Sequence, residues 1–314
     1  MKKNSRIYIA GHTGLIGSAV LRKYKRAGFT NIITRTRQEL DLQNEASVKN
    51  FFKKYKPEYV MLTAAKVGGI RANIAQPAGF MIKNLIIQNN VILAAFENNV
   101  KKLLYVSCGC AYPTESKQPI IEEYLLTGKP EITNEGFAIA KIAGMKLCEK
   151  INLEFKKEFI SCVAANTYGE NDHFDEERSH VISALIKRFH NAKLKNLPSV
   201  TIWGTGKAKR EFIYVDDLAD GLYLLMNKYS DPQTINLGTG QEVTIKKLSR
   251  IIQKVVGYKG DIQFDSSKPD GMRRRVFDSS KINKLGFKPK TSLEEGIGRA
   301  YRFFLSTLKE NIID

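Results

Sequence analysis

The segment "NEGFAIAK", Asn134 to Lys141, holds a lysine in a setting suited to proton transfer. A lysine directly after an "AIA" run is expected to act with a hydroxyl four residues earlier, one turn back on a helix. Position 137 is Phe, and a phenyl ring has no proton to donate. Lys141 and Phe137 therefore mark a candidate catalytic site that lacks a proton donor at the expected position.

Two cysteines and a histidine add groups that ionise near neutral pH when suitably placed. Cys108 and Cys110 lie in "SCGCAYP", and His180 lies in "RSHVI". Taken alone, such cysteines are typical of buried small apolar residues, and such a histidine is typical of a solvated loop. The four cysteines are too sparse for a disulfide scaffold, and one Cys-x-Cys pair lacks the second ligand pair of a zinc site. We expect no bound metal.

A glycine-rich turn near the N-terminus predicts a dinucleotide site. In "RIYIAGHTGLIGSAV" the glycines are spaced G-x-x-G-x-x-G, after a predicted strand and at the start of a predicted helix. This context lets a pyrophosphate approach the backbone at the positive helix N-terminus. The alternative is a tight turn needed only for packing. The predicted cofactor contacts in the turn are Gly11, Thr13, Gly14, Leu15, Ile16 and Gly17.

The end of the second predicted strand favours NADP over NAD. An NAD-selective site normally places an acidic residue there, but "TRTRQELDL" offers Arg35 and Arg37. Guanidinium groups suit a 2′-phosphate. The alternative is a pair of solvated loop arginines. Asp41 and Leu42 follow at positions expected to contact the adenine end.

Short apolar runs alternate with amphipathic stretches through the first half of the chain. This alternation predicts an α/β fold, a doubly wound parallel sheet of the Rossmann type, with a smaller interleaved C-terminal substrate domain. We expect residues 1–165 and about 211–240 to form the dinucleotide domain. Residues of about 166–210 and 241–314 are expected to form the substrate domain.

The formal charge of +18 admits several partners. Nucleic acid is disfavoured, because the basic residues are spread out with no arginine-rich arm. Two explanations of the charge remain: a basic surface of no special function, or a small acidic substrate. No uninterrupted apolar run reaches the roughly 18 residues of a membrane span. The short apolar run at the N-terminus leads into the glycine turn and reads as a strand, not a signal peptide. We expect a cytoplasmic protein with no membrane partner.

Six motifs together resemble the GDP-L-fucose synthase family of the extended short-chain dehydrogenase/reductases. They are "AGHTGLIGSA", "AAKVGGIRAN", "YPTESKQP", "AIAKIAGMKLCE", "SHVISALIKRFH" and "IWGTGKAKREFIYVDDLA", and they run in order along almost the whole chain. The resemblance implies NADP(H) as cofactor, a GDP-4-keto-6-deoxy sugar as substrate and a homodimer. It implies reduction at C4 with epimerisation at C3 and C5.

The resemblance also assigns catalytic roles. Lys141 matches the family lysine, which supports a tyrosine that protonates the carbonyl oxygen. The family tyrosine falls on Phe137 and the family serine on Cys108, so two of three reductive groups differ. Cys110 and His180 match the pair that moves protons beside the ketone. Loss of a general acid typically costs about 10²–10⁴-fold in rate, so we expect a slow reductase that still binds both ligands.

Further contacts follow from the same resemblance. Ala164 and Asn166, with Lys141 and His180, are expected to line the cofactor. The GDP-sugar is expected to contact Arg188, Trp203, Arg210 and Asp278. Arg273 stands where the family usually has proline, which leaves the sugar open between a hexose and a heptose.

Three interpretations of Phe137 and Cys108 stay open. They are engineered substitutions that trap a complex, marks of a natural variant that only epimerises or only binds a nucleotide sugar, or features of a non-catalytic basic binding protein. Tyr112 and Tyr168 lie near matched motifs and are weak candidates for a substitute acid.

Overall fold

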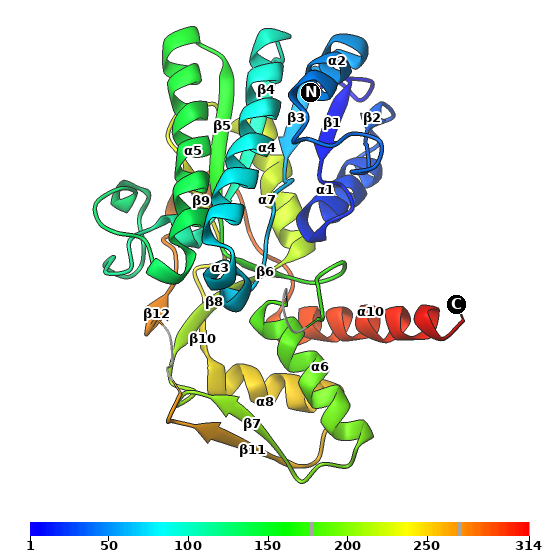
Figure 1. Cartoon of the computed structure of the whole chain (residues 1–314), viewed down its shortest axis with the longest axis vertical. Helices are drawn as coiled ribbons and strands as arrows, with labels where there is room; N and C mark the ends of the chain where they lie inside the picture. The colour runs from blue at the N-terminus through cyan, green and yellow to red at the C-terminus, as the bar shows by residue number, and fades with distance from the viewer. Residues whose placement is uncertain (176–178, 269–271, 314) are drawn as a thin grey trace.

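A six-stranded parallel sheet forms the centre of the molecule (Figure 1). The computed structural model describes residues 1–175, 179–268 and 272–313. The strand order is β2-β1-β3-β4-β5-β9, and every neighbouring pair is parallel. This confirms the predicted doubly wound sheet. The strands are β1 (Ile7–Ala10), β2 (Ile32–Ile33), β3 (Tyr59–Leu62), β4 (Lys102–Cys108), β5 (Glu158–Ala164) and β9 (Ile235–Leu237).

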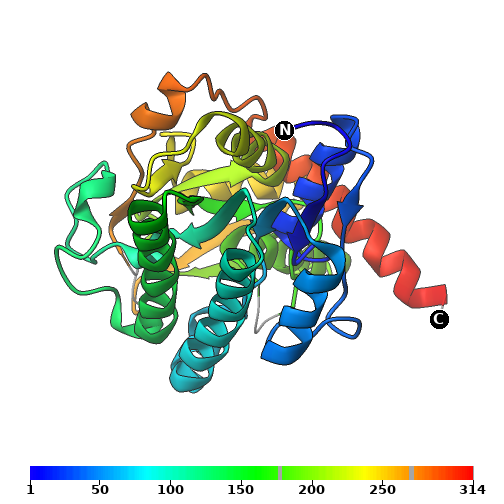
Figure 2. The same cartoon turned by 90° about the horizontal axis from the view of Figure 1, so that it is seen from above.

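Helices cover both faces of this sheet, which is why its central strands are almost entirely buried. All four residues of β1 are buried, as expected for a parallel strand with a layer on each side. Figure 2 shows α1 (Leu15–Arg26) and α7 (Val215–Lys228) on one face. The other face carries α2 (Glu45–Tyr55), α4 (Pro77–Glu97) and α5 (Glu135–Phe155).

Helix α4 is long and apolar enough, by length and composition alone, to cross a membrane. In the structure it packs between α2 and α5. Its buried face carries two amides with specific partners: Asn84 Nδ2 donates to the Lys66 carbonyl (3.0 Å) and Gln88 Nε2 to the Ala140 carbonyl (2.7 Å). Buried polar groups satisfied by neighbouring segments are typical of an interior helix in a folded domain.

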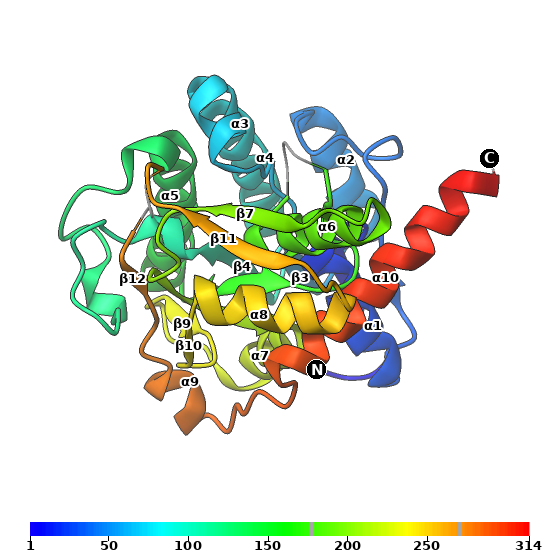
Figure 3. The same cartoon turned by 90° about the horizontal axis from the view of Figure 1, so that it is seen from below.

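A second layer lies beyond the carboxyl ends of the large sheet. It contains one sheet with the order β10-β8-β12, in which β6 also pairs with β8, and the two-stranded sheet β11-β7. Figure 3 shows α6 and α8 beside β7 and β11. The elements are β6 (Asn166–Tyr168), β7 (Ser199–Trp203), β8 (Lys209–Tyr214), β10 (Glu242–Thr244), β11 (Asp261–Asp265), β12 (Arg274–Arg275), α6 (Val181–Leu194), α8 (Ile245–Val256) and α10 (Leu293–Ile313).

The chain crosses between the two layers more than once. After β5 it enters the second layer through β6, and it returns through α7 to add β9 beside β5. The expected boundary near residue 211 falls inside β8, whose partners all lie outside the large sheet, whereas β9 ends just before the boundary near 240. The division into two domains stays a prediction. Shorter elements are α3 (Ile70–Ala75), α9 (Ser280–Lys284) and 3-10 turns at Gly109–Ala111, Glu122–Tyr124 and Ile132–Asn134.

Candidate active site

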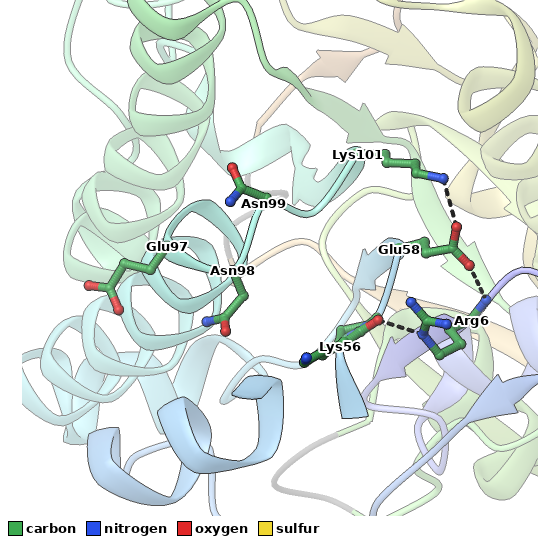
Figure 4. Close-up of a pocket in the computed structure, with 8 residues that line it drawn as sticks. Arg6, Lys56, Glu58, Glu97, Asn98, Asn99 and Lys101 are labelled. Atoms are coloured by element: carbon green, nitrogen blue, oxygen red, sulfur yellow. Dashed lines mark hydrogen bonds and ion pairs between the residues drawn. The ribbon is translucent and has the colours of Figure 1, made fainter. Parts of the chain in front are cut away.

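The predicted site residues gather where the parallel strands end. Gly11 follows β1, Cys108 ends β4 and Ala164 ends β5. In open α/β sheets, ligands bind at this carboxyl edge. A wide hollow of about 500 Å³ instead lies at the opposite edge (Figure 4), next to residues that precede strands. There Glu58 accepts hydrogen bonds from Lys101 Nζ (2.7 Å) and the Arg6 backbone N–H (3.0 Å), so the hollow carries structural ion pairs and none of the predicted site residues.

The glycine turn has the shape that a dinucleotide requires. Gly11 has φ +91°, and a Cβ there would lie 2.8 Å from the backbone of Ala64. A Cβ on Gly17 would lie 2.0 Å from the Gly11 carbonyl oxygen. Gly14 caps the start of α1, whose first turn has no acidic side chain. The exposed helix N-terminus therefore suits a pyrophosphate, because the glycines let the backbone of the turn come close to it.

The two predicted phosphate-binding arginines differ in how they are held. The Arg35 guanidinium lies over the Tyr55 ring, 4.6 Å from its centroid, and donates to the Thr34 carbonyl (2.6 Å). Arg37 is largely exposed, and its guanidinium lies 3.8 Å from the Asp41 carboxylate. Leu42 packs against the core, and its carbonyl accepts a bond from Asn90 (2.9 Å). Both arginines stand beside the β1–β2 end of the sheet, where an adenosine phosphate would lie.

Lys141 is a buried cation on α5. It is 5% exposed, and its Nζ donates to the Val106 carbonyl (3.0 Å) and lies 4.7 Å from the centroid of the Tyr105 ring. Desolvation lowers the pKa of Lys141, although the nearby Cys108 and Cys110 thiols oppose that change. The Tyr105 hydroxyl donates to Gln88 (2.6 Å), so it is already engaged. The structure thus brings the predicted lysine to the end of β4.

Phe137 lies one turn before Lys141 on α5 and is half-buried. Its ring meets Phe80 edge-on, with centroids 6.3 Å apart, and the Lys141 Nζ is 5.8 Å from its centroid. The ring therefore keeps the packing that a tyrosine ring would make and supplies no hydroxyl. Neither candidate substitute is free, because the Tyr112 hydroxyl donates to Asn236 (2.7 Å) and the Tyr168 hydroxyl to the Leu293 carbonyl (3.5 Å).

The two site thiols touch. Cys108 Sγ and Cys110 Sγ are 3.1 Å apart, where β4 runs into the Gly109–Ala111 turn. The hydrogen bond from Cys110 lowers the pKa of Cys108 to about 7; burial opposes the change and Lys141 supports it. The same bond and burial raise the pKa of Cys110 well above its usual range. The pair therefore loses its first proton from Cys108.

His180 caps the start of α6 and points to a carboxylate. Its Nδ1 lies 3.0 Å from Asp172, which is buried and also accepts a hydrogen bond from Ser183. Desolvation opposes a charge on the imidazole, but the hydrogen bond and the negative charge of Asp172 outweigh it and raise the pKa of His180. The negative charge of Cys108 in its thiolate form adds to this increase in the pKa of His180.

Arg275 and Glu211 border the site and were not predicted. A small cavity at the end of β4 is lined by Gly109, Ala164, Ala165, Asn166, Glu211, Arg275 and Phe277. The Arg275 Nε atom is buried and, within the described residues, has no hydrogen-bond partner. Glu211 is buried and accepts bonds from the Phe277 N–H (2.7 Å) and the Gly240 N–H (2.7 Å), which ties the segment after β12 to the backbone at Gly240. Desolvation raises the pKa of Glu211.

Ala164 and Asn166, two expected cofactor contacts, belong to this border. Ala164 is buried at the end of β5, and the Asn166 amide donates to the Glu211 carbonyl (2.8 Å). The motif "REFIYVDDLA" contained Glu211, but only the long-range contacts to β12 reveal what its carboxylate holds.

The four predicted substrate contacts are spread over the second layer. Trp203 on β7 is 53% exposed, and the Arg71 guanidinium from α3 lies 5.3 Å from its ring centroid. Arg188 is exposed on α6 and donates to the Thr201 carbonyl (2.9 Å), beside the same strand. Arg71 lies in the motif "AAKVGGIRAN", and its pairing with Trp203 was not foreseen.

The other two contacts are tied to their local backbone. The Arg210 guanidinium donates to the Lys209 carbonyl (2.8 Å). Asp278 accepts the Ser280 N–H (2.7 Å) at the start of α9, and hydrogen bonds from Ser280 lower the pKa of its carboxyl group. Contact of either residue with a substrate stays a prediction.

Comparison with known proteins agrees with this geometry. Residues 7–238 match the model of the NAD dependent epimerase/dehydratase family. GDP-L-fucose synthase 1 of Arabidopsis thaliana is 48% identical over 306 residues, which is 98% of this chain and 95% of the relative.

Two solved structures from Campylobacter jejuni have the same fold over nearly their full length. A GDP-6-OMe-4-keto-L-xylo-heptose reductase superposes with a TM-score of 0.92 at 41% identity, covering 98% of this chain and 99% of that one. A GDP-mannoheptose C4 reductase with NADP bound gives a TM-score of 0.89 at 42% identity, covering 97% and 99%. The chain belongs to the NAD-dependent epimerase/dehydratase family, within the branch of GDP-L-fucose synthases and GDP-sugar reductases.

Proposed function

We propose that this protein is an NADPH-dependent reductase that acts at C4 of a GDP-4-keto sugar. The observation that carries the proposal is the buried Lys141 ammonium beside Cys108 at the end of β4, on the sheet edge that also holds the glycine turn. Bound NADPH supplies the hydride. Gly11, Gly14 and Gly17 hold its pyrophosphate, Arg35 and Arg37 its 2′-phosphate, and Lys141 the nicotinamide ribose.

The GDP-sugar lies between the two layers in this proposal. Arg188 and Arg210 neutralise the diphosphate, and Trp203 offers an apolar plate to the nucleotide or the sugar. Arg275, whose Nε has no hydrogen-bond partner within the part of the chain that the structure describes, lies within electrostatic reach of Cys108 and is a further group for a sugar hydroxyl. The sugar is either a 6-deoxy-hexose or a heptose, and the heptose is supported by the two reductases that resemble this chain in structure.

Phe137 sets the expected rate. Restoring the missing phenol with Phe137→Tyr adds a proton donor one turn from Lys141 without changing the packing against Phe80. We expect kcat to rise, by the full factor of about 10²–10⁴ that a general acid contributes only where no other side chain donates the proton in the parent. Such a rise supports the interpretation that the phenol was removed from an otherwise intact reductase.

The test follows NADPH oxidation at 340 nm with a GDP-4-keto-6-deoxy-hexose and with the matching GDP-4-keto-heptose. Turnover by the Phe137→Tyr variant with either sugar supports the proposal, and the faster sugar identifies the substrate. If neither the parent nor this variant oxidises NADPH with either sugar, the proposal fails.

Epimerisation without reduction is a second candidate, favoured by one observation. Cys110 and the His180–Asp172 pair are both in place, whereas Phe137 removes only the reductive donor. Solvent deuterium entering C3 or C5 of the sugar, with no oxidation of NADPH, would establish this activity. The raised pKa of Cys110 argues that such exchange is slow at neutral pH, because the thiolate is the proton acceptor.

We also infer a homodimer formed through α4 and α5. These helices pack side by side and expose apolar side chains: Ile82, Ile86, Leu93, Ile139, Leu153 and Phe155. A second copy of the same helix pair would cover this surface by two-fold symmetry. Light scattering should report a dimer that Ile82→Glu with Ile139→Glu converts to a monomer. Leu194→Glu, on an exposed apolar residue of α6, is the control and should leave the dimer intact. A monomeric parent would overturn the inference.

A cytoplasmic location completes the proposal. The four cysteines are free thiols, and reduced thiols are usual in the compartment where NADPH-dependent reductions run.

A further inference from the structure

We propose that Cys108 is the proton donor for reduction of the C4 ketone in this protein, in place of the phenol that Phe137 lacks. This inference rests on the proposed reductase function. It assigns Cys108 an acid role that differs from the hydrogen-bonding role of the serine it replaces.

The position of Cys108 favours this role. It is the last residue of β4, two residues beyond Val106, whose carbonyl holds the Lys141 ammonium at 3.0 Å. It is partly accessible, whereas Cys110 is buried with 8% exposure. The thiol therefore lies within electrostatic reach of Lys141, while the Phe137 ring near the same ammonium contributes only an apolar wall.

The groups around Cys108 tune its acidity. Cys110 Sγ lies 3.1 Å away and donates to the Cys108 thiolate when it forms. Lys141 and Arg275 bring positive charge, and His180 and the buried Tyr105 hydroxyl are also within electrostatic reach. The hydrogen bond from Cys110 is the largest influence, and with the two cations it brings the pKa of Cys108 to about 7 despite burial. General acids work best when their pKa lies near the working pH. An ordinary phenol has a pKa of about 10, so Cys108 is the stronger acid.

The chemical step balances. As the hydride adds to C4, the π electrons of the carbonyl move to its oxygen, the Cys108 S–H bond breaks and an O–H bond forms. Cys108 is left as a thiolate that accepts a hydrogen bond from Cys110 and is stabilised by the Lys141 and Arg275 cations. It regains a proton from water after the product leaves.

A double-mutant cycle tests the role. Cys108→Ser keeps a hydroxyl donor of similar size but removes the acidic thiol. In the parent, where residue 137 is Phe, we expect this change to lower kcat by about 10²–10⁴-fold. In the Phe137→Tyr background the phenol is the donor, so the same change should cost a much smaller factor. Equal factors in the two backgrounds, or no loss in the parent, would overturn the proposal.

The pH profile adds a readout that a structural role would not move. The donor must carry its proton, so kcat of the parent should fall as pH rises through about 7. In Phe137→Tyr this decline should move to higher pH. A parent whose kcat is flat from pH 6 to about 9, or rises there, contradicts an acid with this pKa.

Iodoacetamide alkylation of the unliganded protein gives a test without turnover. Peptide mass spectrometry should show Cys108 reacting with a midpoint near pH 7 in the parent. The midpoint should shift upward in Cys110→Ala, which removes the hydrogen-bond donor. Cys148 and Cys162 are buried thiols whose pKa values are raised, and they serve as internal references. A Cys108 midpoint at or above the ordinary thiol value of about 8.5 would overturn the proposal.

The two proposals can fail separately. If Phe137→Tyr reduces the sugar but Cys108→Ser is silent in the parent, only the role of Cys108 is lost. If Cys108 titrates as expected but Phe137→Tyr oxidises no NADPH, the reductase function itself is wrong and this inference falls with it.

Discussion

Lys141 acts on its surroundings through charge. A buried ammonium held by one backbone carbonyl stabilises any anion that forms beside it, and the Cys108 thiol lies within its electrostatic reach. The hydrogen bond from Cys110, with support from this cation, explains why burial, which alone would raise the pKa of Cys108, does not prevail there. Lys141 therefore influences the ionisation of the Cys108 thiol.

Replacing Lys141 should uncouple these effects. In Lys141→Met the cation is lost, so the pKa of Cys108 should rise and its alkylation midpoint should move to higher pH. Lys146→Met, on the same helix but beside Glu149, is the control and should leave the midpoint unchanged. An unchanged midpoint in Lys141→Met would show that the lysine does not influence the thiol.

The charge of His180 depends on Asp172. Asp172→Asn removes the carboxylate that raises the pKa of His180, so this pKa should fall toward or below its usual value of about 6.5. Because the native pKa is raised, the stability that the pair contributes is present below the unfolded pKa and lost as pH rises through the native one. A proton NMR titration of the His180 ring gives the pKa directly. Ser183→Ala keeps the carboxylate and should not lower the pKa of His180. If the pKa of His180 falls in both variants, the hydrogen-bond network and not the charge of Asp172 alone raises it.

At the residue scale, candidate site residues could be predicted where sequence motifs are local. The glycine turn and the Lys141 position each lie within a dozen residues, so their spacing is visible in the chain. The partners of Asp172, Glu211 and Arg275 were missed, because Glu211 meets Phe277 across 66 positions and no periodic pattern signals such a contact. The touching thiols were foreseen only as neighbours in sequence, since the 3.1 Å contact depends on how the Gly109–Ala111 turn folds.

At the scale of elements, the β1–α1 junction is the most tightly packed part of the cofactor site. Gly17 lies on α1 directly against the Gly11 carbonyl, while a Cβ on Gly14 would meet that oxygen at 3.6 Å, an ordinary contact. The three glycines therefore do different work. Gly17 sets the distance between strand and helix, and Gly14 leaves the helix N-terminus open.

This difference predicts two outcomes for one kind of substitution. Gly17→Ala should push α1 away from β1, lower the melting temperature and abolish NADPH binding. Gly14→Ala should leave the melting temperature close to the parent value, because its methyl group has space and φ is −83°. Thermal unfolding by circular dichroism and NADPH titration check both. Equal melting temperatures for the two variants would contradict the packing argument.

Strand and helix types in the first half followed from the alternation of apolar runs, since a parallel sheet buries its strands on both faces. The second layer was harder. Its strands are short and pair across long separations, as β6 and β12 do with β8, so their partners could not be inferred from spacing.

At the scale of the whole molecule, the large sheet is completed only by a late segment. Strand β9 pairs with the last three residues of β5, and α7 covers α1. A fragment of residues 1–165 lacks both, so it leaves one edge of the sheet unpaired and one helical face bare.

We therefore expect the fragment 1–165 to aggregate or to melt without cooperativity. Circular dichroism of the refolded fragment, compared with the full chain, tests this. A sharp, reversible transition in the fragment would show that the first five strands fold independently.

The pairing of Arg71 with Trp203 joins α3, beside the large sheet, to β7 in the second layer. Trp203 is the single tryptophan of the chain, so all tryptophan fluorescence of the protein reports on this one residue. A guanidinium 5.3 Å from the ring and solvent on about half of its surface make that emission sensitive to anything that enters between the layers. The molecule thus carries a built-in optical reporter, and we expect binding of a guanine nucleotide to the unlabelled protein to change its tryptophan emission.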